Sequence, residues 1–270
     1  MSGGAGAGPR RILLVRHGES TANVAAGEAE RAGLEVIDVG SRDADVELSE
    51  LGRRQAATVG DALAGQLGAD WLGTSRVWTS PYRRARQTAQ LAAGAEAGAG
   101  GGAPAGSTER DARVNDGDGF LVDERLRDRE LGILDALTTL GVDTRLPQES
   151  ARRSWLGKFY YRPPGGESWA DVALRIRSFL RDAEPAAGTA PLVVFTHDAV
   201  VSLFAYVLLR FDEDQLTRFL AERVVSNASI TSFVPDGDGR WTLESFADAS
   251  HVEAAGITAT EHTGTDTDGA

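Results

Sequence analysis

The chain has no cysteine among its 270 residues and no long apolar run. Without cysteine it cannot form a disulfide framework, a thiolate zinc site or an iron–sulfur cluster. No stretch approaches the roughly 18 consecutive apolar residues of a membrane-spanning helix, and the opening residues MSGGAGAGPRR lack the apolar segment of a signal peptide. We therefore expect a soluble, cytoplasmic protein that does not associate with a membrane.

Positive charge is also scarce in this sequence. The chain has 28 lysines and arginines against 40 aspartates and glutamates, which gives a formal net charge of −12. This balance argues against a general affinity for nucleic acid or for an anionic membrane. We expect no nucleic-acid partner, and an anionic ligand would have to be attracted by a locally basic site.

Glycine and acidic residues are concentrated in three segments. Residues 1–9, 92–119 and 251–270 hold 15 of the 32 glycines and seven of the 12 excess negative charges. These segments have too few large apolar side chains to offset the entropy lost on ordering. We predict a disordered leader at 1–9, a flexible insertion at 92–119 and a disordered acidic tail at 251–270, around a single domain that spans residues 10–250.

Short apolar runs alternate with helical patterns in the rest of the chain. The sequence predicts strands at residues 11–15, 77–80, 192–196, 230–234 and 241–246. It predicts helices at residues 49–67, at 168–184, where Ser168 and Asp171 form a capping pair, and after Asp198. This alternation indicates an α/β domain with a largely parallel sheet, in which ligands bind at the carboxyl ends of the strands.

Two of the four histidines follow predicted strands. His17 comes after the strand at 11–15, and His197 comes after the strand at 192–196. Arg16 and Gly18 flank His17, so that a cation and a residue permitting close backbone approach bracket the imidazole. A single histidine in such a place is more often hydrogen-bonded within the core or a loop, and that alternative stays open for each. Two histidines at strand ends nevertheless point to a site.

Three arginines follow the third predicted strand. Pro81 suits the first turn of a helix, and Arg83, Arg84 and Arg86 come directly after it. Such a run is usually a solvated helix face, and we expect this for two of the three. One arginine near a helix N-terminus and the strand ends can bind a phosphate through two hydrogen bonds.

Four motifs occur along the chain. They are RHGESTAN at residues 16–23, LSELGRRQA at 48–56, TSPYRRARQTA at 79–89 and GGES at 165–168. Together they resemble the motifs of the histidine phosphatase superfamily, branch 1, whose members are phosphoglycerate-mutase-like, and they are nearest to broad-range phosphatases of that branch. The resemblance implies a three-layer α/β fold with a mostly parallel central sheet flanked by helices.

The same resemblance implies a metal-independent phosphomonoesterase that hydrolyses small phosphorylated metabolites through a phosphohistidine. His17 would be the nucleophile, and Arg16, Asn23, Arg84 and His197 would hold the phosphoryl oxygens. Phosphoryl transfer suits such a set, because its transition state spreads negative charge over the equatorial oxygens. A reference pKa of about 6.5 also leaves neutral imidazole available as a nucleophile near physiological pH. The scheme requires no metal ion and no cofactor.

The proton donor departs from the family pattern. That donor is usually a glutamate in L-x-E-x-x-x-G, whereas this chain reads LRDRELG, with Asp128 at the matching position. Aspartate can perform the same acid–base work if the backbone lies closer. Glu124 and Glu130 are nearby substitutes. Alternatively, Asp128 only pairs with Arg125 or Arg127.

A second departure is Asp198, which follows His197 where the family more often has glycine. The H-D pair resembles the proton-donor motif of the superfamily's other branch, the acid-phosphatase and phytase type. Asp198 is therefore a secondary candidate for the proton donor. We expect it instead to be the N-cap of the helix that follows.

The substrate is the least determined part of this interpretation. Six basic and aromatic residues either cover the site or belong to an amphipathic helix with a solvated basic face: Arg152, Arg153, Lys158, Tyr160, Tyr161 and Arg162. No counterpart of the longer substrate-binding insertion of true mutases is evident, which favours hydrolysis. A phosphoglycerate mutase, and a catalytically weak phosphate-binding or interaction protein on the same fold, stay open as alternatives. The expected partner is a small phosphorylated substrate, and a homodimer is compatible with the sequence.

Overall fold

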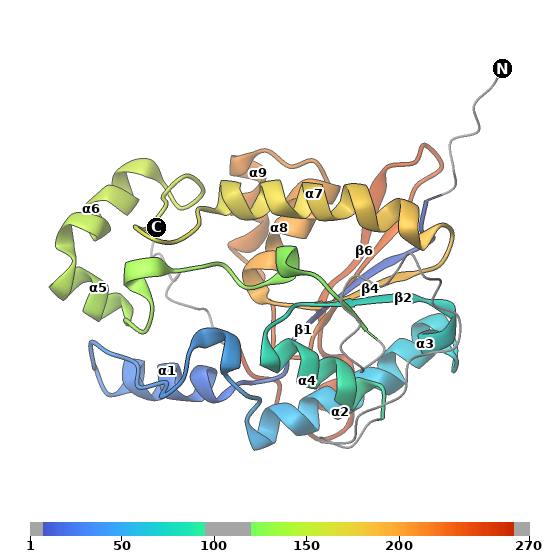
Figure 1. Ribbon diagram of the computed structural model, residues 1–270, viewed down its shortest axis with the longest axis horizontal. Helices are drawn as coiled ribbons and strands as arrows, with labels where there is room; N and C mark the ends of the chain where they lie inside the picture. Colours follow the sequence, from blue (N-terminus) through green and yellow to red (C-terminus); the bar gives the residue numbers. More distant parts are fainter. Residues whose placement is uncertain (1–7, 95–119, 262–270) are drawn as a thin grey trace.

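A six-stranded sheet lies at the centre of the computed structural model, which describes residues 8–94 and 120–261 (Figure 1). The strand order is β3-β2-β4-β1-β5-β6. The strands are β1 (Ile12–Arg16), β2 (Arg76–Thr79), β3 (Leu121–Val122), β4 (Leu192–Thr196), β5 (Ile230–Pro235) and β6 (Trp241–Asp248). Strands β3, β2, β4 and β1 are parallel, whereas β5 is antiparallel to both of its neighbours. The predicted α/β class with a mostly parallel sheet is confirmed.

Helices cover both faces of this sheet, as predicted for a three-layer fold. The helices are α1 (Thr21–Arg31), α2 (Glu50–Leu67), α3 (Trp71–Thr74), α4 (Arg83–Ala92), α5 (Thr139–Arg145), α6 (Pro147–Leu156), α7 (Trp169–Ala187), α8 (Asp198–Leu208), α9 (Glu213–Leu220) and α10 (Ser250–Ala254). Short 3-10 helices are η1 (Asp43–Asp45), η3 (Glu124–Leu126) and η4 (Gly132–Leu134). In Figure 1, α7 and α8 lie on one side of the sheet and α2 and α4 on the other, while α5 and α6 extend beyond its end.

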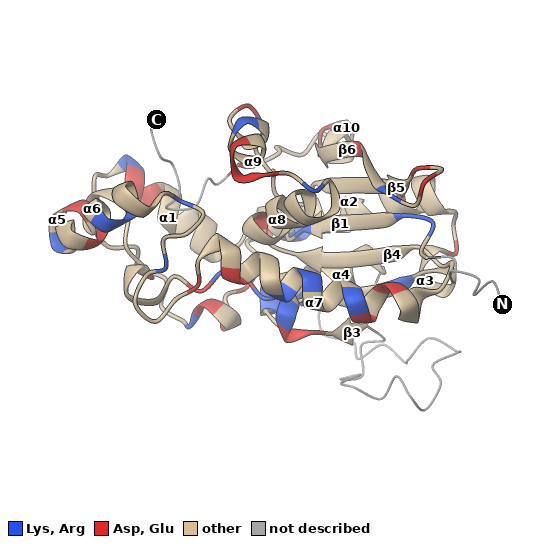
Figure 2. Ribbon diagram, turned by 90° about the horizontal axis from the view of Figure 1, so that it is seen from above, with Lys and Arg blue, Asp and Glu red and all other residues tan. Residues whose placement is uncertain are grey.

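The alternation of side chains along the central strands produces two separate cores. In β1, Ile12 and Leu14 pack with α7 and α8, whereas Leu13 and Val15 pack with α2 and α4. The residues of β4 divide between the two cores in the same way. Because both faces are covered, β1 and β4 are apolar except at their last residues, Arg16 and Thr196. Most of the central sheet is free of charged residues (Figure 2). This buried sheet gives the loops at its edge a rigid base.

The carboxyl ends of β1, β2 and β4 meet at one edge of the sheet. The backbone N–H of His17 donates to Thr196 O at 3.0 Å, and that of Ser80 donates to Phe195 O at 2.9 Å. The sheet register therefore continues one residue beyond each strand. It places His17, Ser80 and His197 side by side, as expected for the ligand-binding edge of a parallel sheet.

Helix caps agree with the sequence in one case and differ in another. Ser168 and Asp171 form the predicted capping box at the start of α7. The prediction that Pro81 lies in the first turn of a helix is wrong, because α4 begins at Arg83 with Tyr82 as its N-cap. The Ser80 hydroxyl accepts a hydrogen bond from the Tyr82 N–H, and this local turn delays the helix start.

The predicted disordered tail is wrong for residues 251–261. Val252 of α10 is fully buried in the core under α2, which pulls this segment onto the domain. The Gln55 side chain donates to Thr258 O and to the Thr260 hydroxyl, and Asn227 N donates to Thr260 O.

Residues 262–270, like 1–7 and 95–119, lie outside the described residues. Of the predicted insertion, Ala92 is the buried last residue of α4. Within the described ranges, no helix is both long and apolar enough to cross a membrane.

Candidate active site

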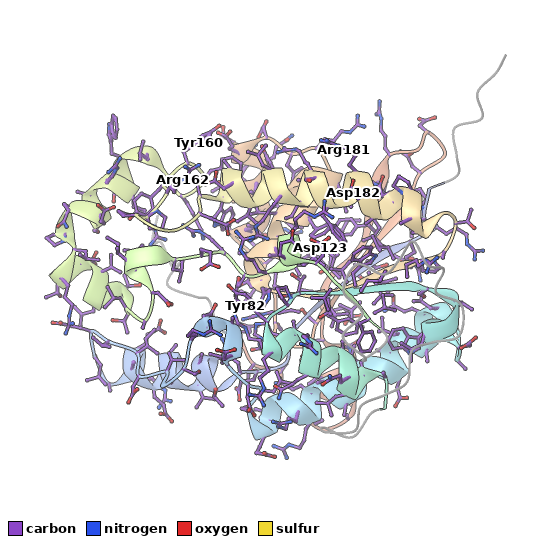
Figure 3. All side chains as sticks on the ribbon, in the orientation of Figure 1. Tyr82, Asp123, Tyr160, Arg162, Arg181 and Asp182 are labelled. Atoms are coloured by element: carbon purple, nitrogen blue, oxygen red, sulfur yellow. The ribbon has the colours of Figure 1, made fainter. Side chains whose placement is uncertain are left out.

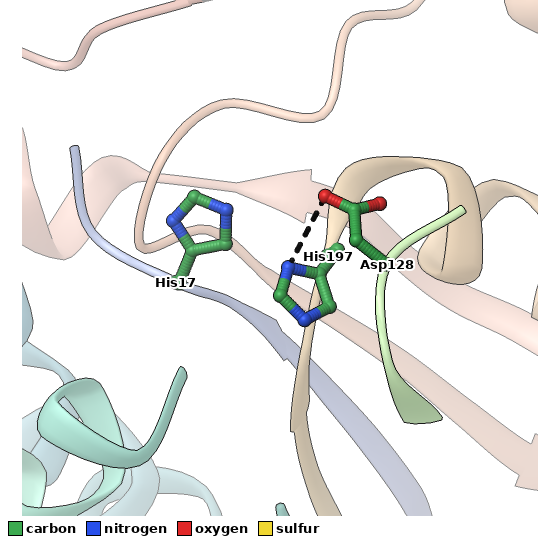
Figure 4. A group of neighbouring side chains, drawn as sticks. All are labelled: His17, Asp128 and His197. Carbon is green, nitrogen blue, oxygen red and sulfur yellow. Dashed lines mark ion pairs between the residues drawn. The ribbon is translucent and has the colours of Figure 1, made fainter. Parts of the chain in front are cut away.

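Four of the predicted site residues lie together at the sheet edge. The imidazole rings of His17 and His197 have centroids 5.2 Å apart, in an edge-to-face arrangement. Both rings are buried, and the side chains of Arg84 and Asp128 contact them. Figure 4 shows the two imidazoles with the Asp128 carboxyl group beside His197. The alternative in which each histidine serves only its own part of the core does not fit this convergence.

The tautomer of His17 follows from its hydrogen bonds. Its Nδ1 lies 2.7 Å from Gly18 O, and since a carbonyl oxygen can only accept, Nδ1 carries the hydrogen. The Nε2 atom then keeps its lone pair, which accepts the Arg84 Nε–H at 3.3 Å. Burial, and next the charges of Arg84, His197 and Arg16, hold the pKa of His17 well below its usual value. His17 therefore presents a neutral, nucleophilic Nε2.

His197 is oriented by Ser80, a residue that the sequence interpretation did not single out. Ser80 Oγ accepts from the Tyr82 N–H and lies 2.8 Å from His197 Nε2. Because the Asp128 carboxylate beside His197 Nδ1 can only accept, we assign the ring hydrogen to Nδ1, so that Nε2 accepts from the Ser80 hydroxyl. The His197 Nδ1–H then faces the Asp128 Oδ2 atom at 3.3 Å, and it has no hydrogen-bond partner in the part of the chain described. Burial, followed by Arg84, Arg175 and Arg16, holds the pKa of His197 well below its usual value. A neutral His197 is thus a donor aimed into the site. The sequence could have indicated Ser80, because it lies in the TSPYRRARQTA motif directly after a predicted strand.

Arg84 is the central cation of the site and is 4 % exposed. It donates to His17, to Asp128 Oδ2 at 3.0 Å and to the carboxylate of Asp43. Although burial lowers the pKa of Arg84, Asp43 and Asp128 outweigh it and keep that pKa above the usual value. Arg83, by contrast, is more than half exposed, as expected for a solvated arginine of this helix.

Asp128 lies beside His197 and Arg84. Its Oδ1 accepts from the Arg129 N–H at 2.9 Å, and its Oδ2 faces Arg84 and His197. Its side chain is about one-quarter exposed, so that water reaches the carboxyl group.

The alternative in which Asp128 merely pairs with Arg125 or Arg127 is wrong. Arg125 binds Asp123 and Asp182, and Arg127 binds Glu167. The pair of Arg125 with Asp182 ties the segment to α7, and the Asp128 carboxylate is left facing His197 and Arg84.

The secondary acids have other partners. Glu130 accepts a hydrogen bond from the Tyr82 hydroxyl at 2.9 Å, and burial, followed by this bond, raises the pKa of Tyr82. The expected N-cap role of Asp198 is wrong, because β4 runs directly into α8 with His197 as the N-cap. Asp198 instead lies in the first turn of α8, where a negative charge is favoured, and its charge only partly opposes the lowering of the Arg16 pKa by burial.

Arg16 and Asn23 are the other two residues predicted to bind the phosphoryl group. Arg16 is buried and donates to Val225 O, and burial lowers its pKa against the opposing charges of Asp198 and Asp128. Asn23 Oδ1 accepts from the backbone and the hydroxyl of Ser20, which forms a capping box at the start of α1. Asn23 thus has a structural role that the sequence interpretation did not foresee.

A cavity of about 400 Å³ lies beside the histidine pair. Its lining consists of Glu19, Asn23, Val24, Gly27, Arg31, Asn227, Ala259, Thr260 and Glu261. Asn227 connects it to the site, because its side chain donates to His17 O. None of His17, Arg84 and His197 lines this cavity, so these three side chains lie outside it.

The histidine pair and Asp128 also have the spacing of metal ligands. One ligand atom from each of His17, Asp128 and His197 lies within 4.8 Å of the others, the one such group among residues 8–94 and 120–261. Arg84, however, donates to both His17 Nε2 and Asp128 Oδ2. A guanidinium in that position repels a metal cation and attracts an anion, so the electrostatics favour a phosphoryl group.

The basic and aromatic segment after α6 is bound to the scaffold. Arg162 pairs with Asp171 of α7, and the Tyr160 hydroxyl donates to Glu213 of α9. Figure 3 shows Tyr160 and Arg162 beside the start of α7. Lys158 lies over the ring of Trp169. The predicted amphipathic helix is wrong for residues 158–162, because α6 ends at Leu156 and the chain then forms turns and irregular backbone. The contacts of these residues are those of a solvated and packing surface rather than of a cover over the site.

Known proteins resemble the chain over most of its length. A family model described as the histidine phosphatase superfamily (branch 1) matches residues 12–99 and 108–249, which include all six strands. The glucosyl-3-phosphoglycerate phosphatase of Mycobacterium tuberculosis is 27% identical over 265 residues, covering 91% of this chain and 97% of that protein. The phosphoglycerate mutase-like protein AT74H of Arabidopsis thaliana is 31% identical over 174 residues, covering 64% of this chain and 52% of that protein, so the chain spans about half the length of this relative. The solved complex of mycobacterial glucosyl-3-phosphoglycerate phosphatase with inorganic phosphate has a TM-score of 0.59 and 25% identity, covering 90% of this chain and 99% of that one.

Proposed function

Since the chain belongs to the histidine phosphatase superfamily (branch 1) and is an enzyme that hydrolyses phosphate monoesters, we propose that it does so through a phosphohistidine on His17. The observation that carries this proposal is the pair of tautomers assigned to His17 and His197 from their hydrogen-bond partners. His17 Nε2 holds a lone pair against the Arg84 guanidinium, and the His197 Nδ1–H points into the same space. A tetrahedral phosphoryl group is the ligand that uses both.

In the first step, His17 Nε2 attacks phosphorus, and the bond from phosphorus to the ester oxygen breaks. The departing oxygen takes a proton from the Asp128 carboxyl group, which lies at the edge of the site. Arg84, Arg16 and the His197 Nδ1–H stabilise the charge on the equatorial oxygens. The arriving dianion also favours protonation of His197, because a nearby negative charge raises the pKa that burial had lowered.

In the second step, water attacks the phosphohistidine. The Asp128 carboxylate takes a proton from this water, the bond from phosphorus to Nε2 breaks, and orthophosphate leaves with His17 restored. Asp128 is one methylene shorter than the usual glutamate, and its contacts with Arg84 and the Arg129 backbone support a position close enough for this work. No step needs a metal ion, so turnover in the presence of a chelator should equal turnover without it.

The first test is single-turnover chemistry with a ³²P-labelled phosphate monoester. His17→Ala should form no phosphoprotein and show no turnover, because it lacks the attacking nitrogen. Asp128→Asn should slow an alkyl phosphate by about 100-fold or more but p-nitrophenyl phosphate much less, since nitrophenolate leaves without a proton. His251→Ala is the control, because this half-buried histidine on α10 interacts with Ala228 O and with the charge of Asp248 and does not contribute to the pKa shifts of His17 and His197. Full turnover by His17→Ala would refute the mechanism, and phosphoprotein in the wild type would discard the weak-binding alternative.

The substrate proposed is a small phosphorylated metabolite. Incubation with 3-phosphoglycerate distinguishes hydrolysis, which releases orthophosphate, from mutase transfer, which yields 2-phosphoglycerate. We propose hydrolysis, because the sequence has no evident counterpart of the mutase insertion. The cytoplasmic location and the homodimer stay predictions.

A further inference from the structure

The Asp43 carboxylate binds the Arg84 guanidinium with the same two-point geometry that a bound phosphate would use. This residue begins η1, in the connection between α1 and α2. Arg84 Nη1 donates to Asp43 Oδ1 at 2.8 Å and to Asp43 O at 2.6 Å, and Nη2 donates to Oδ2 at 3.2 Å. Two carboxylate oxygens on two guanidinium nitrogens form the fork that arginine also makes with phosphate.

Every donor of Arg84 is engaged in this structure. The guanidinium has five N–H groups, and they serve His17 Nε2, Asp128 Oδ2 and three oxygen atoms of Asp43. A phosphoryl oxygen can therefore bind Arg84 only by replacing one of these acceptors. The bond from Arg84 Nε–H to His17 Nε2 breaks when that lone pair attacks phosphorus, which frees one donor. Before the attack, and for the Nη1 and Nη2 donors, the acceptor that can leave is Asp43, because Asp128 stays in place as the proton donor.

The position of Asp43 suits such an exchange. Its side chain is 41% exposed, so that a released carboxylate can be hydrated at once. Burial, opposed by Arg84 and reinforced by Asp128 and Asp135, raises the pKa of Asp43. Arg84 thus compensates several neighbouring carboxylates, and a phosphoryl dianion that takes over its N–H groups leaves Asp43 facing negative charge.

We propose that Asp43 is an internal competitor of the substrate: its carboxylate occupies the Arg84 guanidinium and must be displaced when the phosphoryl group binds. This proposal rests on the proposed function only in placing the phosphoryl group at Arg84. Asp43 thereby sets the affinity of the site for phosphate esters, so that a substrate is retained only if it binds Arg84 better than this carboxylate does.

The test measures binding of inorganic phosphate to the intact protein by titration calorimetry. Asp43→Asn keeps the size of the side chain and loses its charge, so it should bind phosphate about five- to twentyfold more tightly than the wild type. Asp45→Asn is the matched control, because Asp45 belongs to the same 3-10 helix and pairs outward with Arg42. Its affinity should stay within about twofold of the wild type. With an aryl phosphate, Asp43→Asn should lower KM in the same proportion.

Three results would overturn the competitor role. Weaker or unchanged phosphate binding by Asp43→Asn would mean that Asp43 positions Arg84 instead. A crystal structure of the wild type with phosphate in which the Arg84 to Asp43 bonds persist would also refute it, and this measurement does not depend on any variant folding. Absence of phosphate binding by both proteins would likewise refute the competitor role, because nothing would then compete with Asp43 for Arg84. The proposed function fails separately, only if the wild type forms no phosphoprotein on His17.

Discussion

Ser80 is the positioning residue whose removal tests the geometry of the site most directly. Its hydroxyl is fully buried and joins two groups, accepting from the Tyr82 N–H at 3.2 Å and donating to His197 Nε2 at 2.8 Å. Ser80→Ala removes one oxygen and leaves both groups without this partner. Because an unsatisfied buried polar group costs about 1–3 kcal/mol, the free energy of unfolding should fall by about 2 kcal/mol or more.

The effect on catalysis follows from the tautomer of His197. With the serine, the hydrogen lies on Nδ1 and faces Asp128 and the site; without it, the tautomer with hydrogen on Nε2 is no longer disfavoured. Loss of a hydrogen bond worth about 1 kcal/mol predicts a fall of kcat/KM by about fivefold to tenfold, with p-nitrophenyl phosphate as substrate. The ¹⁵N chemical shifts of the His197 ring should show the change of tautomer, which a purely structural role of Ser80 would not produce.

Ser229→Ala is the control for this experiment. Ser229 is 1% exposed, and its Oγ has no hydrogen-bond partner within the described ranges. Its removal takes away the same buried hydroxyl group without breaking a bond, so activity and tautomer should stay as in the wild type. If Ser80→Ala keeps both the kcat/KM and the ¹⁵N shifts of Ser229→Ala, the proposed orientation of His197 is refuted.

Two further predictions concern stability. The folded protein keeps His17 and His197 neutral, whereas in the unfolded chain their pKa is about 6.5. The free energy of unfolding is therefore highest above that pH and decreases as the pH falls. Each histidine contributes up to about 1.4 kcal/mol per pH unit to this decrease. Urea unfolding between about pH 7.5 and 5.5 should show this slope reduced in His17→Asn, and an equal slope would contradict the pKa direction. Gly52→Ala should destabilise the protein and disturb the His17 loop, because its Cβ would lie 1.9 Å from Glu19 O. Gly65 lies in the same helix, and a Cβ added there would have no atom within 4 Å. Gly65→Ala should therefore stabilise the protein by about 0.5–1 kcal/mol. Melting temperatures of the two variants that shift in the same direction would contradict this prediction.

The parts predicted well share a local cause. The strands before His17 and His197 are continuous apolar runs, and such runs need little context because both faces of a central strand are buried. The cap at Ser168 was predicted because its partner Asp171 is only three residues away. The start of α4 and the order at residues 251–261 were missed, since each depends on a partner outside the local pattern, the Ser80 hydroxyl in one case and the core under α2 in the other.

The candidate site divides in the same way. The predicted strand ends pointed to His17 and His197, and the resemblance to the family selected Arg84 and Asp128. The structure brings these four together. The sequence did not select Asp43, because nothing in the segment SRDADVELS distinguishes Asp43 from Asp45. Only the approach of η1 to α4 separates the acid that binds Arg84 from the one that pairs with Arg42.

The sequence by itself therefore determined the class of fold, the family and the residue types that carry the chemistry. These properties are encoded in side-chain periodicity and in short motifs, whose members are close along the chain. The tertiary structure decided the tautomers of the two histidines, the direction of their pKa shifts and the partners of Arg84. Each of these depends on burial and on atoms far apart in sequence, since hydrogen bonds and charge interactions act over ångströms in space regardless of the number of residues between the partners.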